Sequence, residues 1–180
     1  MNLFFRLLRV FLNAIFSKKD GKITDLYQLK FSVWLTDQDM FAHLTNSRYF
    51  SFSDLGTINF IIRSGCWGTM RKRGWIPVIL SEKVVISKML KFPQGFDLHT
   101  QVTCWDDTYV CLQHNFNRKG RTHATVNVLA KFAATDRSYV NPAMVLETVG
   151  HETQSPPLTN TFIELRQDIL DSKAQQKASV

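Results

Sequence analysis

The first sixteen residues are almost entirely apolar, and their few polar residues recur at helical spacing. Asn2, Arg6, Arg9 and Asn13 are separated by four, three and four positions. On an α-helix these positions form one narrow polar stripe, while apolar side chains cover the rest of the surface. The pattern predicts an amphipathic helix within a basic N-terminal segment, residues 1–22.

After residue 22 the pattern changes to that of an α+β domain over residues 23–136. Residues 25–35 alternate in part between apolar and polar positions, as a half-buried strand does. Residues 47–63 repeat apolar side chains at helical spacing, directly after residue types that cap helix N-termini well. Four further strand-like stretches follow at residues 76–90, 96–105, 109–117 and 122–134.

Turn-forming sequences at residues 106–107 and 117–120 separate the last three stretches as hairpins. The order of strand, loop, long helix and four-strand meander predicts a five-stranded antiparallel sheet wrapped around one helix. Residues 137–180 carry weaker signals, which predict a C-terminal extension with a short helix at residues 161–170 and a polar frayed end.

The composition is that of a globular protein with a buried core. The chain has 180 residues, of which 44% are hydrophobic and 21% charged. Its cysteines, Cys66, Cys104 and Cys111, are odd in number and form no CxxC pair, which argues against a disulfide-stapled secreted module. They are expected to be buried thiols. Because no cluster of residues has metal-ligand spacing, neither a metal nor another cofactor is expected.

The net charge of +7 divides unevenly along the chain. Residues 1–22 hold five basic residues and one acid, residues 23–136 hold thirteen and nine, and residues 137–180 hold four and five. No dense basic block with interleaved aromatic residues and no nucleic-acid reading motif accompanies this charge, so a nucleic-acid partner is not expected. An anionic partner, such as a lipid headgroup or a phosphorylated ligand, is the broader prediction.

The N-terminal helix leaves two interpretations open. At about 1.5 Å per residue its apolar run reaches only ~24 Å, short of the ~30 Å hydrocarbon core, and no small-residue cleavage site follows it. In one interpretation residues 1–17 lie in a membrane interface, where Lys18, Lys19 and Lys22 attract anionic lipid. In the other, the helix packs on the domain or on a partner subunit. We expect a cytoplasmic protein, peripheral to the inner face of a membrane if the first interpretation holds.

The candidate chemistry lies in the loop before the long helix. Asp37, Asp39, His43 and Asn46 bring carboxylates, an imidazole and a carboxamide directly before a helix N-terminus. Free N–H groups and the positive end of the helix dipole can stabilise negative charge there. A carboxylate nucleophile or general base beside an oxyanion site is what acyl transfer requires.

This loop resembles that of the 4-hydroxybenzoyl-CoA thioesterase family, whose members have the hot-dog fold and read approximately D-x-D-x-x-G-H-x-N-N-x-x-Y. The matching residues are Asp37, Asp39, His43, Asn46 and Tyr49. The resemblance extends from about Leu29 to Phe132 and agrees with the predicted order of elements. Asp54 on the helix, followed by Arg63-x-Gly65, is similar to the branch that contains thioesterase superfamily member 6.

The resemblance implies an acyl-CoA thioesterase that releases a fatty or aryl acid and free CoA. Asp39 would attack the thioester carbonyl or activate a water, an N–H near Asn46 would hold the oxyanion, and His43 would orient the loop or contact substrate. The family also implies a homodimer or higher homo-oligomer, with the site between subunits. The residues expected to bind substrate are Tyr49, Asp54, Lys91 and Arg118, the last two through the phosphates of CoA.

The same residues also have purely structural interpretations. Asp39 could cap its own loop, Asn46 could cap the helix, and Tyr49 could pack in the core. Ala42 stands at the usual family glycine and Thr45 at the first asparagine, which leaves room for weak or lost activity. The alternative function is a catalytically weak acyl-CoA or lipid binding protein, peripheral to a membrane.

Overall fold

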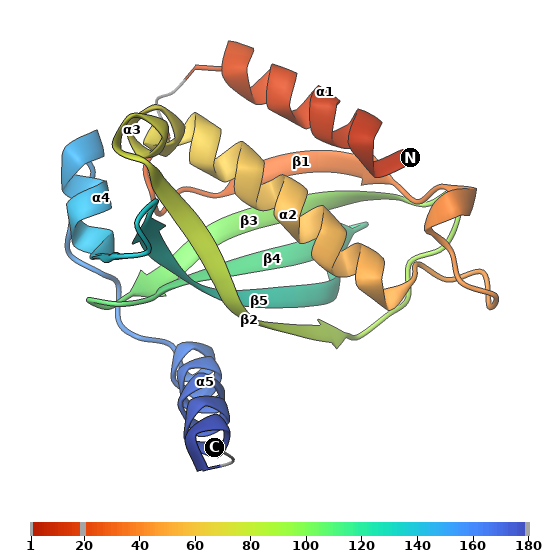
Figure 1. Ribbon diagram of the computed structural model, residues 1–180. Coiled ribbons are helices and arrows are strands. Elements are labelled where there is room, and N and C mark those ends of the chain that lie inside the picture. The colour runs from red at the N-terminus through yellow and green to blue at the C-terminus, as the bar shows by residue number, and fades with distance from the viewer. Residues whose placement is uncertain (1, 19–20, 179–180) are drawn as a thin grey trace.

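A long helix, α2, lies across the concave face of one curved antiparallel sheet in the computed structural model, which describes residues 2–18 and 21–178 (Figure 1). The helices are α1 (Asn2–Phe16), α2 (Asn46–Arg63), α3 (Cys66–Arg73), α4 (Pro142–Val149) and α5 (Asn160–Ala178). The strands are β1 (Tyr27–Ser32), β2 (Trp75–Ile86), β3 (Gly95–Trp105), β4 (Val110–Arg118), β5 (Arg121–Ala134) and β6 (Tyr139–Val140). The predicted α+β fold, a sheet of five strands around one long helix, is confirmed, and the two-residue β6 adds a short pairing to β5.

The strands are ordered β1-β3-β4-β5-β2, and all neighbours are antiparallel. The predicted hairpins β3–β4 and β4–β5 are present, but β2 pairs with β5 rather than with β3. The predicted four-strand meander is therefore wrong in its first strand. Residues 87–94 carry the chain from the β2 edge to β3, which lies between β1 and β4. A hydrophobic pattern identifies a strand without naming its neighbours, so this crossover could not be read from the sequence.

Close approach of α2 to the sheet depends on a glycine. Gly56 lies where the helix crosses β3 and β4, and a Cβ there would overlap Thr100 Oγ1 and press on His114 Nδ1 at 3.1 Å. Thr100 and His114 are themselves joined by a hydrogen bond of 2.9 Å, and the second ring nitrogen of His114 lies 3.4 Å from Thr57 Oγ1. The glycine that interrupts the apolar face of the predicted helix is therefore the contact point between helix and sheet.

Lowering the pH from 7 to 5 should destabilise the fold, because His114 stays neutral in its buried site. Full burial lowers the pKa of His114 from 6.5 to about 3. Below pH 6.5 the unfolded chain takes up a proton that the folded chain binds only near pH 3, so stability is complete above pH 6.5 and is lost as the pH falls. We expect the free energy of unfolding to fall by about 2 kcal/mol between pH 6.5 and 5, measured by urea unfolding.

A matched pair of variants tests whether His114 causes this dependence of the free energy of unfolding on pH. His114→Gln should lose most of the pH dependence, whereas His99→Gln, on a less buried position of β3, should keep it. An unchanged slope in His114→Gln would show that another group is responsible.

Local chain chemistry explains two differences from the predicted elements. Helix α3, which was not predicted, is bounded by Gly65 and Gly74, both left-handed with φ of 82° and 67°. Helix α4 was not predicted either; it starts where Pro142 occupies its first turn and the side chain of Asn141 accepts the N–H of Ala143.

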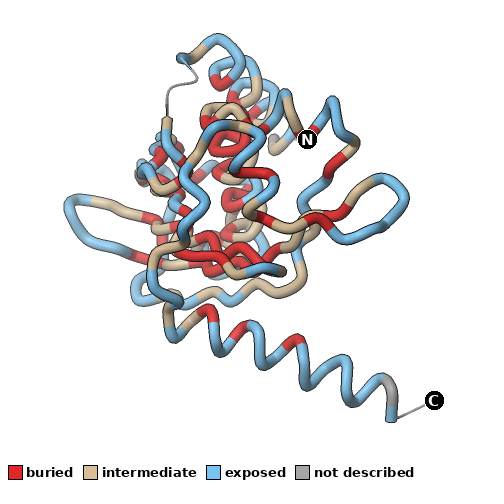
Figure 2. Tube along the Cα trace, turned by 90° about the vertical axis from the view of Figure 1, so that its left-hand side faces the viewer, coloured by how far each residue is buried: buried red, intermediate tan, exposed pale blue. Residues whose placement is uncertain are grey.

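The C-terminal helix continues beyond the short segment predicted at residues 161–170. Helix α5 runs from Asn160 to Ala178 and lies across the outer face of the sheet (Figure 2). Phe162, Leu165 and Ile169 are buried in its first half, against Leu129 and the two cysteines of β3 and β4. Its second half is exposed, so tertiary contact stabilises only the start of the helix.

The predicted N-terminal helix is present as α1, and it packs on the domain. Two arginines of its polar stripe bind the domain: the buried Arg6 donates through Nη2 to the carbonyl oxygen of Ser32 at 3.1 Å, and the exposed Arg9 through Nη2 to that of Lys30 at 3.3 Å. Lys19, expected to attract lipid, lies outside the described residues. In the part of the chain that the structure describes, no helix combines the length and apolar character needed to cross a membrane.

Candidate active site

The loop of residues 37–45, called the site loop below, is closed by hydrogen bonds across its base. Gln38 and Leu44 form an isolated antiparallel bridge. The N–H of Leu44 also donates to the carbonyl oxygen of Leu90 at 2.8 Å, which ties the loop to the connection between β2 and β3. These bonds hold the loop in place immediately before the N-terminus of α2, at the end of the molecule where β1 ends (Figure 1).

Asp39 lies on the exposed side of the site loop, with one carboxylate oxygen bound by the loop itself. Its Oδ1 accepts hydrogen bonds from the N–H groups of Phe41 at 2.9 Å and His43 at 3.1 Å. The N–H of Asp39 in turn donates to the carbonyl oxygen of His43 at 2.9 Å. Among the described residues, none donates to Oδ2 of Asp39. The carboxylate therefore caps its own loop and still has one oxygen available for chemistry.

Ala42 takes the left-handed conformation that a glycine would adopt freely. Its φ is 60°, at the position where the resembling family has glycine. For a residue with a Cβ this conformation costs about 1–2 kcal/mol. The alanine thus keeps the shape of the glycine turn at some expense of stability.

Replacing Ala42 by glycine should stabilise the protein by about 1 kcal/mol, because relief of the left-handed strain exceeds the extra flexibility of the unfolded chain. Urea unfolding at neutral pH measures the change. As a matched control, Ala174→Gly, in the exposed half of α5, should destabilise by up to about 1 kcal/mol. A loss of stability in Ala42→Gly would contradict the argument.

Asp37, the first carboxylate of the loop, is buried and holds the loop to the N-terminal helix. Its Oδ2 accepts the N–H of Trp34 at 2.9 Å and lies 2.8 Å from Nη2 of Arg6. Nε of Arg48 lies 3.6 Å from its other oxygen, and the N–H of Thr45 donates to its carbonyl oxygen at 3.0 Å. Asp37 is thus engaged in structural contacts through Oδ2 and its carbonyl oxygen, while its buried Oδ1 accepts no hydrogen bond from the described residues and has only Arg48 near it.

The N-terminus of α2 begins beside the site loop. Thr45 is the N-cap residue, and its side chain makes no capping hydrogen bond. Asn46 is the first residue of the helix and is exposed, so it is not the cap that one interpretation assigned to it. The first N–H groups of a helix have no partner within the helix, and they carry its positive dipole end. N–H donors that can stabilise a negative charge therefore lie within a few residues of Asp39 in the chain.

Tyr49 is packed in the core instead of facing a substrate. Its side chain is fully buried, and its ring meets the ring of Phe116 edge-on at 5.0 Å between centroids. Burial raises the pKa of the phenol above its usual value of 10. The expected substrate contact is thus corrected: one turn into the helix, the side chain already points at the sheet.

Asp54 lies five residues further along α2, on its exposed side, and is near a carboxylate that sequence reasoning did not select. Burial raises the pKa of Asp54. Burial raises the pKa of Glu82 on β2 as well, and the negative charge of Asp54 adds to that shift. Glu82 is the single acid in the stretch from Ile76 to Leu90. A lone acid in a largely apolar and basic strand was the signal that the sequence offered for Glu82. Only the fold brings that strand against α2.

The two expected phosphate-binding cations lie at the same end of the sheet without joining the loop carboxylates. Lys91 is exposed and directly follows Leu90, whose carbonyl oxygen binds the site loop. Arg118 ends β4 and lines an open groove of about 410 Å³ along β1 with Lys30, Asp97 and Lys119. The structure thus groups Asp39, His43 and Asn46, with Lys91 nearby, and separates them from Asp54 and Arg118.

Across residues 2–18 and 21–178, no group of three or more His, Cys, Asp or Glu side chains is arranged to hold a metal ion. The chemistry available in the described part of the site is therefore that of a carboxylate beside helix N–H groups.

Comparison with known proteins identifies the family to which these features correspond. A family model described as the thioesterase-like superfamily matches residues 33–163, from the end of β1 into α5. Protein THEM6 of Xenopus laevis is 28% identical over 80 residues, a stretch that covers 44% of this chain. That alignment spans only 39% of the length of the Xenopus protein.

Solved structures share the fold at low identity. YbaW, a probable thioesterase from Escherichia coli, superposes with a TM-score of 0.64 at 13% identity, covering 68% of this chain and 94% of its own. SAV2348 from Staphylococcus aureus, solved in complex with CoA, gives 0.62 at 16% identity over 78% and 92% of the two chains. A DHNA-CoA thioesterase, also from Staphylococcus aureus, gives 0.60 at 14% identity over 68% and 85%. These likenesses show the hot-dog fold.

Proposed function

This chain belongs to the thioesterase-like superfamily, and from that premise we propose that it hydrolyses acyl-CoA thioesters to a free acid and CoA at the site loop. The observation that carries the proposal is the position of Asp39, whose Oδ2 is open to solvent beside the N-terminus of α2. Hydrogen bonds to Oδ1 fix the carboxylate, so little motion is lost when a substrate arrives.

Two routes through Asp39 are open. In the first, the carboxylate oxygen bonds to the thioester carbonyl carbon, the C–S bond breaks, and water then hydrolyses the resulting anhydride. In the second, Asp39 takes a proton from a water that attacks the same carbon. In both, CoA leaves as a thiolate that takes up a proton, and an N–H near Asn46 holds the negative charge on the carbonyl oxygen. His43 positions Asp39, because its backbone binds Asp39 in both directions.

The oligomeric part of the proposal is a dimer that closes the site. Strand β2 is a free edge of the sheet and exposes Ile76, Ile79 and Val85. Exposed edge strands with apolar side chains are apt to pair with another chain. In the proposed homodimer the substrate lies between subunits, with Asp54 beside the acyl portion and the cations Lys91 and Arg118 toward the CoA phosphates. The CoA complex of SAV2348 supports the choice of thioester.

The test is a panel of acyl-CoA thioesters with aliphatic and aromatic acyl groups, with release of free thiol as the readout. The proposal requires turnover of at least one member above the uncatalysed rate. Sedimentation equilibrium on the same preparation should give the mass of a dimer or of a multiple of it. Binding of an acyl-CoA without thiol release would instead support the catalytically weak acyl-CoA or lipid binding protein, which the strained Ala42 at the usual family glycine favours.

A further inference from the structure

Helix α1 buries one side on the domain and exposes a second, apolar side to solvent. A surface helix normally turns its apolar side to the core and its polar side to water. Here the inward side combines Val10 and Ala14, which are 2% and 0% exposed, with Arg6, which is 7% exposed and binds Ser32 and Asp37. The opposite side, called the apolar face of α1, is open to solvent and consists of Phe4, Phe5, Leu8, Leu12, Ile15 and Phe16.

This docking leaves large apolar side chains exposed on the described surface. Phe5 is 66% exposed and Phe16 is 84% exposed. Single exposed apolar residues are ordinary on protein surfaces, but a contiguous face of them marks an interaction site. Since the two arginines fix the rotation of the helix, α1 cannot turn this face inward without breaking the Arg6–Asp37 ion pair.

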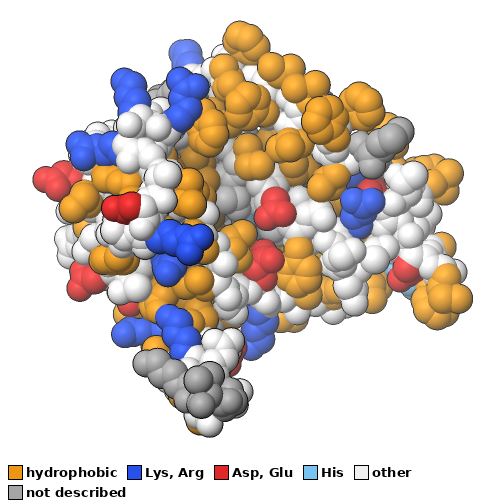
Figure 3. All heavy atoms as spheres, viewed as in Figure 1, with side chains coloured by type: hydrophobic (Ala, Val, Ile, Leu, Met, Phe, Trp, Pro, Cys, Tyr) orange, Lys and Arg blue, Asp and Glu red, His pale blue; other side chains and the backbone are white. Residues whose placement is uncertain are grey.

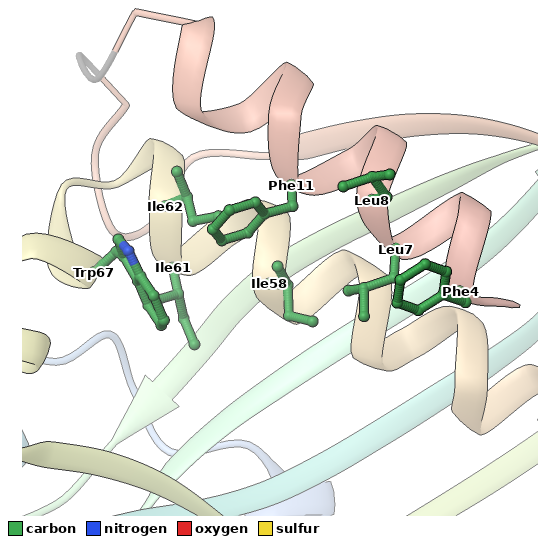
Figure 4. Close-up of a pocket in the computed structure, with 8 residues that line it drawn as sticks. All are labelled: Phe4, Leu7, Leu8, Phe11, Ile58, Ile61, Ile62 and Trp67. Atoms are coloured by element: carbon green, nitrogen blue, oxygen red, sulfur yellow. The ribbon is translucent and has the colours of Figure 1, made fainter.

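An apolar groove extends the same face onto the neighbouring helices. It has a volume of about 330 Å³ and lies between α1 and α2, with Trp67 of α3 at one end (Figure 4). All its lining side chains are apolar: Phe4, Leu7, Leu8, Phe11, Ile58, Ile61, Ile62 and Trp67. Apart from the indole N–H of Trp67 the groove offers no hydrogen-bonding side chain, so it suits a hydrocarbon surface better than a polar ligand.

Cations border this apolar surface, and two of its three helices, α1 and α3, carry no acids. Neither α1 nor α3 contains an Asp or Glu residue. Lys18 follows α1, and Arg71 and Lys72 are exposed in the last turn of α3. Figure 3 shows apolar side chains along α1, with basic side chains gathered beside them at the end nearer α3. An apolar face with a cationic rim is complementary to anionic headgroups above an acyl layer.

We propose that the apolar face of α1 is the surface by which this protein lies on an anionic lipid bilayer. Helix α1 stays docked through Arg6 and Arg9 and inserts its outer side chains at the level of the headgroups. The groove between α1 and α2 covers part of the acyl layer, while Lys18, Arg71 and Lys72 meet phosphate groups. The protein thereby rests on the membrane with α1 parallel to it. The inference is independent of the proposed hydrolysis.

Sedimentation of the full chain with vesicles tests the proposal. Binding should be seen with vesicles of phosphatidylcholine and phosphatidylserine, should be weaker with phosphatidylcholine alone, and should fall as salt is raised. The double variant Phe5→Ser/Phe16→Ser should bind at least about tenfold more weakly, because two large side chains no longer enter the bilayer. Arg71→Gln/Lys72→Gln should weaken binding only to the anionic vesicles.

Matched controls separate this surface from general stickiness and from misfolding. Ile163→Ser/Leu170→Ser removes two comparably exposed apolar side chains from α5 and should leave vesicle binding unchanged. Arg71 and Lys72 are exposed at the end of α3, so Arg71→Gln/Lys72→Gln should fold normally. This variant therefore tests the membrane surface even if Phe5→Ser/Phe16→Ser folds poorly. The proposal would be overturned if the wild-type protein did not bind anionic vesicles. Vesicle binding by Phe5→Ser/Phe16→Ser equal to that of wild type would also overturn it. So would a lower oligomeric mass of that variant if wild type bound no vesicles.

Discussion

Asp39→Asn should lower kcat for acyl-CoA hydrolysis by about a thousandfold, since the carboxylate is the group proposed to bond to the thioester carbon or deprotonate water. Asparagine keeps an oxygen at the place of Oδ1, so the hydrogen bonds from Phe41 and His43 can persist and the loop is retained. The substitution thus removes charge and nucleophilicity with little change in shape. Free-thiol release at saturating substrate measures kcat, and the KM should change much less than kcat.

A matched aspartate separates chemistry from loop capping. Asp136 is also exposed and also caps its own turn, accepting hydrogen bonds from the N–H and hydroxyl of Ser138 at 2.9 and 2.6 Å. Asp136→Asn should leave kcat unchanged. If Asp39→Asn retained wild-type kcat, the reacting group would have to be sought elsewhere, with the Asp54 and Glu82 carboxylates as the next candidates.

Arg6→Met should destabilise the protein by about 3–5 kcal/mol, because it leaves the carboxylate of Asp37 buried beside no close cation. Asp37 is 1% exposed, and its ion pair with Arg6 is 2.8 Å long, whereas Arg48 stands at 3.6 Å from the other oxygen. Arg6 is also stacked over Phe52, with 4.9 Å from its guanidinium carbon to the ring centroid. Methionine preserves much of this packing volume. The loss in free energy of unfolding, measured with urea, therefore reports mainly the removal of the charge.

A double variant and a surface pair provide the controls. Arg6→Met/Asp37→Asn should recover more than half of the loss, since no buried charge remains and the amide oxygen can still accept the N–H of Trp34. Lys83→Met breaks an ion pair with Glu164 of similar length, 3.0 Å, but both side chains are exposed and it should matter little. A loss in Arg6→Met as small as that in Lys83→Met would mean that Asp37 is satisfied without α1.

The Arg6–Asp37 pair also relates α1 to the site loop. Asp37 receives Arg6 on its carboxylate and the N–H of Thr45 on its carbonyl oxygen, so one residue joins the N-terminal helix to both ends of the loop that carries Asp39. The first carboxylate of the loop motif therefore has a structural reason to be there, and the second is the one left with a free oxygen.

The sequence by itself determined the local elements and the chemistry of one loop. Apolar periodicity and turn residues are local signals, and they located α1, α2 and strands β1 to β5 with shifts of a few residues at their ends. The spacing of Asp37, Asp39, His43 and Asn46 likewise predicted a carboxylate beside a helix N-terminus, because nine or ten residues of chain suffice to place those groups together.

Only the tertiary structure decided which distant residues meet. The pairing of β2 with β5, the closeness of Glu82 to Asp54, and the burial of Tyr49 all depend on contacts between segments far apart in the chain. The same holds for α1, whose pattern showed two faces without saying which one faces the domain. Burial of the Arg6–Asp37 ion pair, together with Val10 and Ala14, fixed which side of the helix faces the domain and left the apolar face exposed, because a charge taken out of water needs its partner more than an apolar side chain needs cover.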